Sequence, residues 1–337
     1  MSATTPISEV GEKAMIREFI KPFFNAANDP GGVGDDCAMI SLGGQIVLAS
    51  TDRVPADLTA FRLGILDHDG LGEYLARLNL SDIAACGGSP LALLLNLGLP
   101  ETLSFDAVKQ ICSGVARQAG KFGCKVLGGD ITSAVELSIS ATAIGIVAEG
   151  AQLTRSGARP GDTIFLSRPP GLTPAAFAYF LSKTQCEMTA EDVAVLRAQF
   201  TSIEPMVTLG MALAASGVCT SCMDNTDGVG QSLTELAEAS AVSFVVDRDG
   251  MRVHEVVYRT AEATGATVHA LLFNGGADFS LIGTLHGPWA ADAVKERFGA
   301  TVDVIGTVEK GTGVYIRDLG GLAKLHFQGW NYFSGAV

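Results

Sequence analysis

The stretch NLSDIAACGGSP, residues 79 to 90, places an amide and a carboxylate inside an apolar segment that ends at a glycine pair and a proline. On a helix, Asn79 and Asp82 share one face, because positions i and i+3 are neighbours. If the helix ends at Gly87, Asp82 can be an ordinary carboxylate turned towards solvent. Alternatively, this face meets other polar groups, and the segments on either side decide between the two interpretations.

The segments around this helix have the patterns of a mixed sheet packed with helices. Glycines 43 and 44 predict a hairpin turn between two strands, and Ser104 is the predicted N-cap of a second helix. Partial alternation and β-branched residues indicate a long strand further on. The predicted helices of this half are 11–24, 72–86 and the one that starts after Ser104, and the predicted strands lie within 31–42, 45–52, 91–100 and 135–150.

Residues 153–167, LTRSGARPGDTIFLS, are dense in glycine, proline and polar side chains before they turn into a short strand. This composition predicts a domain boundary, with a first domain over 1–152 and a second over 153–337. Helices are expected near 204–216, 230–240 and 254–264, and strands near 218–223, 243–247, 279–285 and 302–308. Since strands and helices do not alternate regularly, we expect α+β layers in both halves.

The bulk composition limits the class of protein. The 337 residues are 47% hydrophobic and 18% charged, which is typical of a compact enzyme of more than one domain. A net charge of −13 argues against a nucleic-acid partner, although an acidic site can hold phosphates through Mg²⁺. No apolar stretch is long enough for a membrane span, and the first residues lack the pattern of a signal peptide. Together with seven cysteines, an odd number, this predicts a cytoplasmic protein with free thiols.

The common short catalytic motifs are absent from the sequence. There is no P-loop, no complete dinucleotide fingerprint and no G-x-S-x-G elbow. Cys219 and Cys222 form a lone C-x-x-C, for which a structural role is the simpler interpretation because a zinc site needs further ligands.

Aspartate instead recurs beside glycine or at predicted strand ends. Each aspartate has an ordinary explanation, such as a turn for Asp35 and Asp130 or a helix N-cap for Asp227. Gathered in one place, however, these carboxylates would repel one another unless cations neutralised them, and Mg²⁺ prefers such oxygen ligands. The recurring residues are Asp35, Asp36, Asp52, Asp82, Asp130, Asp224 and Asp227.

Seven motifs in a fixed order make the chain resemble the thiamine-monophosphate kinase family, which is similar in fold to aminoimidazole-ribonucleotide synthetase. The motifs are GVGDDCAM (32–39), STD (50–52), NLSDIAACGGSP (79–90), LGGD (127–130), LTRSGARPGD (153–162), MDNTDGVG (223–230) and GWNYF (329–333). The resemblance implies a homodimer of two-domain α+β subunits, paired through their N-terminal domains, with an ATP site at the domain junction. It also implies that Asp82 points from the helix end towards a metal cluster, with Asn79 as its polar neighbour.

The resemblance carries specific roles onto this chain. It implies Mg²⁺ and ATP as cofactors, Asp130 and Asp227 as the residues on which catalysis depends, and direct in-line transfer of the γ-phosphoryl group. Nucleotide contacts fall on Gly129, Asp130, Arg155 and Thr226. The implied Mg²⁺ ligands are Asp36, Ser50, Thr51, Asp52, Asp82, Asp130, Asp224 and Asp227.

The acceptor side departs from the family pattern. Thr59 stands where the family has a histidine, and Ala277 stands where it has a glutamate that contacts substrate; Trp330 completes the expected substrate residues. We therefore expect ATP chemistry with an acceptor other than thiamine monophosphate, against the alternative of a conventional kinase with a repacked pocket. Further alternatives are a ligase or dehydratase of the same superfamily that releases ADP and phosphate, and a non-catalytic nucleotide-binding homologue.

Overall fold

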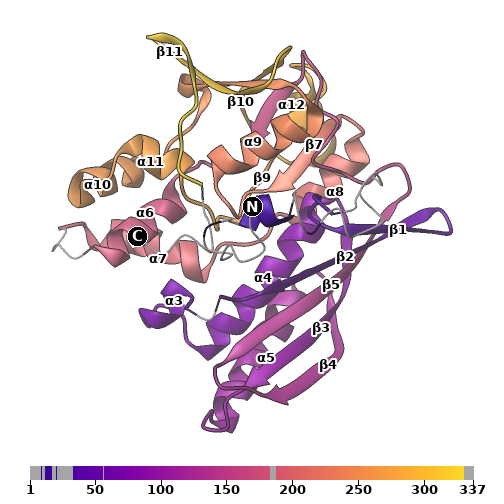
Figure 1. Ribbon diagram of the computed structural model, residues 1–337, viewed down its shortest axis with the longest axis vertical. Coiled ribbons are helices and arrows are strands. Elements are labelled where there is room, and N and C mark those ends of the chain that lie inside the picture. The colour runs from indigo at the N-terminus through magenta and orange to yellow at the C-terminus, as the bar shows by residue number, and fades with distance from the viewer. Residues whose placement is uncertain are drawn as a thin grey trace.

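The computed structural model describes residues 9, 12–16, 20, 33–55, 57–182 and 187–329, which form two α+β domains (Figure 1). The expected helix over 11–24 lies mostly outside these residues, which include only α2 (Glu12–Met15). Trp330 also lies outside them. Among the described helices, none is long and apolar enough to cross a membrane.

The N-terminal domain is a five-stranded sheet in the order β1-β2-β5-β3-β4. Strands β3 and β4 are parallel, and the other neighbours are antiparallel. The hairpin at Gly43 and Gly44 is present, and both glycines have positive φ angles. The elements are β1 (Ala38–Leu42), β2 (Gln45–Arg53), α3 (Thr59–Arg62), α4 (His68–Ala85), β3 (Ser89–Leu99), α5 (Phe105–Gly120), β4 (Lys125–Ser133) and β5 (Ser138–Ala148).

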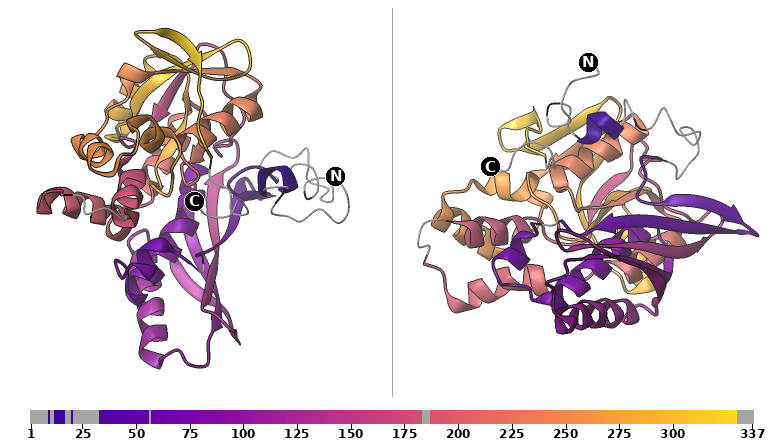
Figure 2. Two further views of the ribbon diagram at one scale, coloured as in Figure 1. Left: turned by 60° about the vertical axis from the view of Figure 1, so that its left-hand side comes forward. Right: turned by 60° about the horizontal axis from the view of Figure 1, so that its bottom comes forward.

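Helices α4 and α5 cover one face of this sheet, whereas no helix of the described residues packs on the other face (Figure 2). The predicted cap of α5 is present, since the Ser104 hydroxyl accepts a hydrogen bond from the amide of Ala107. The two helices approach closely where each has a glycine: a Cβ at Gly114 would lie 2.0 Å from the carbonyl oxygen of Asp69. On the uncovered face Leu94 is exposed, and on the edge strand β4 Leu127 and Ile131 are exposed.

The C-terminal domain is a seven-stranded sheet in the order β12-β11-β8-β10-β6-β9-β7. Its strands are β6 (Thr163–Leu166), β7 (Cys219–Asp224), β8 (Ser243–Asp247), β9 (Leu281–Leu285), β10 (Asp303–Glu309), β11 (Gly313–Asp318) and β12 (Gly321–Lys324). Its helices are α6 (Leu172–Leu181), α7 (Ala190–Thr201), α8 (Val207–Ser216), α9 (Val229–Ser240), η3 (Arg248–Gly250), α10 (Glu255–Thr264), α11 (Val268–Phe273) and α12 (Ala290–Phe298).

Helix α4 joins the two domains. Its N-terminus is capped by Asp67, and it ends before Gly87, whose φ of 74° gives the left-handed turn that commonly ends a helix. Besides the sheet and α5, it contacts α8 and β7 of the second domain. A Cβ at Gly210 of α8 would lie 2.0 Å from the carbonyl oxygen of Ala84. The end of α4 that contains Asp82 is therefore held directly against the C-terminal domain.

Candidate active site at the domain junction

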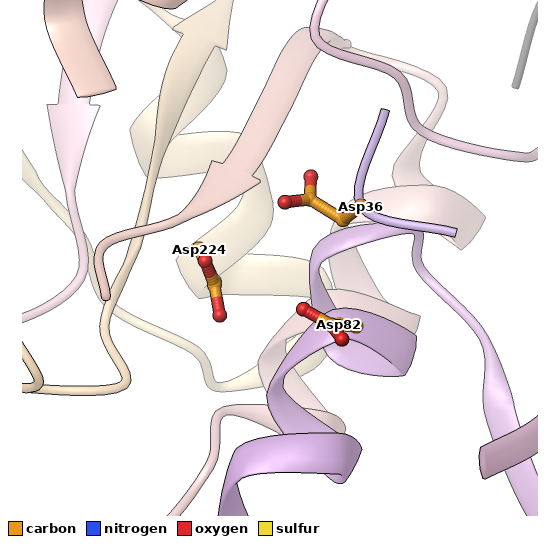
Figure 3. Close-up of side chains that lie close together, drawn as sticks. All are labelled: Asp36, Asp82 and Asp224. Carbon is orange, nitrogen blue, oxygen red and sulfur yellow. The ribbon is translucent and has the colours of Figure 1, made fainter. Parts of the chain in front are cut away.

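Three aspartates from distant parts of the chain meet at this junction (Figure 3). Asp36 precedes β1, Asp82 lies in the last turn of α4, and Asp224 ends β7. One carboxylate oxygen from each lies within 4.8 Å of the others. The domain junction thus brings together carboxylates that are separated by up to 188 residues in the sequence numbering, from Asp36 to Asp224.

Two more aspartates extend this cluster. The Asp52 carboxyl is hydrogen-bonded to that of Asp82, and the charge of Asp227 acts on Asp52. The hydroxyl of Ser50 donates a hydrogen bond to Asp82. Ser50 and Asp52 are two residues apart on β2 and therefore point to the same face of the sheet, the face that α4 covers.

Burial and mutual repulsion oppose ionisation of these groups. Burial raises the pKa of Asp82 well above its usual value, and the charges of Asp52, Asp224 and Asp36 raise it further. The pKa of Asp224 rises to about 7, mainly through burial and then through the charge of Asp36. Burial also raises the pKa of Asp36 and of Asp52. A shared divalent cation would favour the ionised form of all four groups.

Arg155 brings positive charge to one side of the cluster. Its guanidinium lies 2.7 Å from Asp36 and 2.6 Å from Glu235, and its backbone amide donates to Asp35. A single guanidinium shared by two carboxylates does not neutralise the five aspartates. The buried oxygen ligands and the excess of negative charge fit Mg²⁺, which is held by a few carboxylates together with water or phosphate oxygens.

Neighbouring polar groups fix the orientation of the carboxylates. Asn79 is fully buried, and its side-chain oxygen accepts a hydrogen bond from the amide of Asp52 rather than bonding to Asp82. The hydroxyls of Ser81 and Thr226 donate to Asp224 at 2.7 Å and 2.9 Å. The sequence analysis missed Ser81 and Glu235 because an isolated serine or glutamate on a helix has no distinguishing pattern.

The structure does not bring every expected ligand into this cluster. Asp130 is paired across β4 and β3 with Asn96, which is paired with Ser140, which in turn lies opposite Arg53. Residues opposite one another point to the same face, so Asp130 shares a face with Arg53 and lies on the other face from Asp52. Three inter-strand spacings, about 14 Å, also separate Asp130 from β2.

Within one chain, therefore, Asp130 does not bind an ion together with Asp82. The same alternation puts the side chain of Thr51 on the uncovered face, where its hydroxyl donates to the carbonyl oxygen of Ala141. Gly129 lies next to Asp130 on β4. We expected one metal cluster containing all the candidate ligands. Within one chain the structure places Asp130 and Thr51 outside it, because a strand alternates its side chains between two faces.

The expected acceptor residues lie in two places. Thr59 begins α3. Ala277 contacts the loop that contains Thr226 and Asp227, because its amide donates to the carbonyl oxygen of Thr226 at 2.7 Å. Ala277 and Phe279 have φ angles of 61° and 48°, uncommon values for residues with a Cβ. They flank Asp278, whose carboxylate accepts a hydrogen bond from Asn225.

Comparison with known proteins assigns this architecture. Residues 34–147 match the pattern of AIR synthase related protein, N-terminal domain, and residues 159–318 match that of the C-terminal domain. The chain therefore belongs to the AIR synthase related proteins. Within this class it is similar to thiamine-monophosphate kinases, as the following relatives show.

Thiamine-monophosphate kinase of Pyrococcus horikoshii is 29% identical over 336 residues, 98% of each chain. The Mycobacterium tuberculosis enzyme of the same name is 28% identical over 84% of this chain and 83% of its own. The solved structure of AaThiL complexed with AMPPCP and TMP superposes with a TM-score of 0.81 at 25% identity, covering 98% of this chain and 100% of that one. The hydrogenase maturation protein HypE in complex with ATP, at 20% identity and a TM-score of 0.64, shares the fold.

Proposed function

We propose that this protein is an ATP- and Mg²⁺-dependent phosphotransferase that transfers the γ-phosphoryl group directly to an oxygen of a small acceptor. The observation that carries the proposal is the buried aspartate cluster at the domain junction, where Asp36, Asp82 and Asp224 converge. Its relatives by sequence are kinases, and a related solved structure holds AMPPCP and TMP. A binding-only protein would have no need of so many carboxylates in a repulsive cluster.

The residues of the site have different proposed roles. Asp36, Asp82 and Asp224 would hold Mg²⁺, with Asp52 and Asp227 beside them. Bound there, Mg²⁺ would neutralise phosphate oxygens and the charge that develops during transfer. Arg155 is already oriented by Asp36 and Glu235, and it retains further N–H donors for phosphate oxygens. The Thr226 hydroxyl holds Asp224 in place for this role.

The acceptor is proposed to differ from thiamine monophosphate. The alanine at position 277 contacts the loop of Thr226 and Asp227 through its backbone, so a glutamate side chain is missing beside the metal site. Loss of a buried carboxylate that pairs with a cationic substrate changes preference by on the order of 1 to 3 kcal/mol. We also propose that Thr59 and Trp330 contact the substrate.

The decisive experiment identifies products by mass after incubation with Mg-ATP and thiamine monophosphate, and then with small alcohols, amines and monophosphates. We expect ADP together with a phosphorylated product from an acceptor other than thiamine monophosphate. Efficient formation of thiamine diphosphate, with kcat/KM of about 10⁴ M⁻¹s⁻¹ or more, would reject the altered acceptor but keep the kinase. ADP with free phosphate and a ligated or dehydrated product would favour the ligase or dehydratase, and absence of any turnover would favour the binding homologue.

We also propose that two chains pair through the uncovered face of the N-terminal sheet. That face exposes Leu94, and the edge strand β4 exposes Leu127 and Ile131 at 67% each; exposed apolar side chains grouped in this way mark protein interfaces. Asp130 and Gly129 lie on the strand at its edge. Their nucleotide contacts are then made in the site of the partner subunit, which accounts for the distance of Asp130 from the aspartate cluster of its own chain.

The proposal places the protein in the cytoplasm and includes no nucleic-acid partner. The six described cysteines are free, as expected in a reducing compartment. The net charge of −13 opposes binding to a phosphate backbone.

A further inference from the structure

A cavity of about 320 Å³ lies beside Asp278, among β6, α6 and α7. Its polar lining includes Arg168, Thr173 and Glu204, and its apolar lining includes Leu172 and Ile203. This volume suits a small organic molecule. The cavity is separate from the aspartate cluster, yet the two sites share a wall, because Asp278 accepts a 2.9 Å hydrogen bond from Asn225, which follows Asp224 directly.

Arg168 is a half-buried cation without an ion-pair partner among the described residues. Its Nη2 donates to the carbonyl oxygen of Glu204 and to Met206 Sδ, and its Nη1 donates to the carbonyl oxygen of Asp278 at 3.4 Å. Burial lowers the pKa of this guanidinium, although it remains charged at neutral pH. The remaining N–H donors have no described acceptor and are therefore available to a ligand.

The nearby carboxylates are already engaged by other groups. Asp278 accepts hydrogen bonds on both oxygens, from Ser280 and from Asn225. Glu204 accepts from Lys121 at 2.6 Å and from Gln118. Among the charged groups that line the cavity, Arg168 is therefore the one that still has hydrogen-bond donors available to a ligand.

Thr173 supplies a second, independent observation. Thr173 is 1% exposed, and its hydroxyl has no hydrogen-bond partner among the described residues, although the residue lines the cavity. It lies in the first turn of α6, where backbone amides have no partner within the helix and the helix dipole favours negative charge. A buried hydroxyl without a hydrogen-bond partner is energetically unfavourable unless a ligand supplies the missing hydrogen bond.

We propose that this cavity binds an anionic group of the acceptor, a carboxylate or a phosphate, in addition to the oxygen that receives the phosphoryl group. Arg168 is the counter-ion, Thr173 donates the second hydrogen bond, and Leu172 and Ile203 contact the apolar part of the same molecule. Arg168 thereby determines acceptor specificity without touching the transferred group. The inference rests on the proposed phosphotransferase function, which it refines by naming the chemical class of acceptor.

The test is calorimetric titration of the full-length protein in EDTA, without ATP, with inorganic phosphate, propionate or propanol as the probe. We expect one site for an anion, with propanol bound at least tenfold more weakly than propionate. Whichever of phosphate and propionate binds with the higher affinity identifies the kind of anion. Arg168→Gln should weaken anion binding at least tenfold, whereas Arg252→Gln, which removes the charge of an exposed arginine that does not line the cavity, should not change it.

Thr173→Val guards against misfolding as the explanation. Valine has nearly the same shape and removes the hydroxyl without a partner, so thermal stability should stay equal or rise while anion binding weakens several-fold. Equal binding of propionate and propanol, or unchanged anion binding in Arg168→Gln, would overturn the inference. Mg-ATP binding is measured separately on the same protein preparations without EDTA. Its absence from the wild-type protein would reject the phosphotransferase, whereas its presence without anion binding would reject only this cavity.

Discussion

Asp224 is an unfavourable residue for the fold and a necessary one for the proposed site. Its carboxylate is buried beside Asp36, and its pKa is about 7 instead of 3.8. Because the folded pKa is raised, the folded state binds the proton more tightly than the unfolded chain. The stability that this group contributes is therefore complete below pH 4 and is lost as the pH rises through about 7.

The substitution Asp224→Asn should accordingly stabilise the metal-free protein while abolishing its activity. We expect a gain of about 1 to 3 kcal/mol at pH 8 and a smaller gain at pH 5, measured by thermal unfolding in EDTA. The hydroxyls of Ser81 and Thr226 can rotate to bond the amide. Phosphotransfer with Mg-ATP should fall at least about 100-fold, because a metal ligand is lost.

Asp247→Asn is the matched control, since it removes the same charge from an exposed ion pair with Arg317. Its effect should stay within about 0.5 kcal/mol at both pH values, with normal turnover. If Asp224→Asn were no more stable than the wild-type protein at pH 8, the aspartates would not be destabilising one another in the absence of metal.

At the scale of single residues, the sequence located most of the cluster but not its geometry. Asp36, Asp52, Asp82 and Asp224 were recognisable from their motifs, and the structure brings them together. Which face of a strand Thr51 and Asp130 occupy depends on pairing partners that are remote in the sequence. The sequence analysis also did not single out Arg168, whose surroundings arise only when α6, α7 and the loop of Asp278 come together.

At the scale of elements, strongly patterned segments were predicted and weakly patterned ones were missed. The hairpin, helix α5 with its cap, and strands β3 and β5 are confirmed. Helix α6 was missed because its sequence LTPAAFAYFL is apolar on all sides and has no helical period. Strand β4 includes Gly128 and Gly129, which disfavour a strand, and it is formed through its pairing with β3.

The contact between α8 and α4 sets the position of the active site. Gly210→Ala should force these helices apart, because the added Cβ would lie 2.0 Å from the backbone of Ala84, two residues after Asp82. We expect a loss of about 1 to 3 kcal/mol of stability and weaker Mg-ATP binding, measured by chemical unfolding and by titration at a temperature where the variant is folded.

Gly120→Ala is a suitable control, because it adds the same methyl group at the end of helix α5 with no atom within 4 Å. It should be neutral or slightly stabilising, since alanine favours a helix over glycine. Unchanged Mg-ATP affinity and stability in Gly210→Ala would show that this contact does not position Asp82 relative to Asp224.

At the scale of the whole molecule, the separation of Asp130 from the aspartate cluster predicts a site shared by two chains. Subunits with Asp130→Asn and subunits with Asp227→Asn should each form inactive homodimers. A purified heterodimer of the two variants contains one site with both native aspartates if each site draws Asp227 from one chain and Asp130 from the other. We therefore expect about half of the wild-type activity per dimer, measured by ADP release.

A heterodimer of two differently tagged wild-type chains controls for the tags and should be fully active. An inactive mixed heterodimer would mean that both aspartates act within one subunit, and a monomer in sedimentation experiments would exclude the pairing itself. The sequence alone could imply this pairing only through the family resemblance, because exposure of Leu127 and Ile131 depends on β4 being the edge of the sheet.

The positive φ angle of Ala277 bears on how this protein could change during evolution. Alanine and glutamate both have a Cβ, so the backbone at this position is equally unfavourable for either residue. In both cases the backbone amide can donate its hydrogen bond to the carbonyl oxygen of Thr226, which holds the loop. Some alanine codons differ from glutamate codons by a single base. A population that needs another acceptor can therefore gain or lose this carboxylate in one mutational step, without first rebuilding the loop around Asp278.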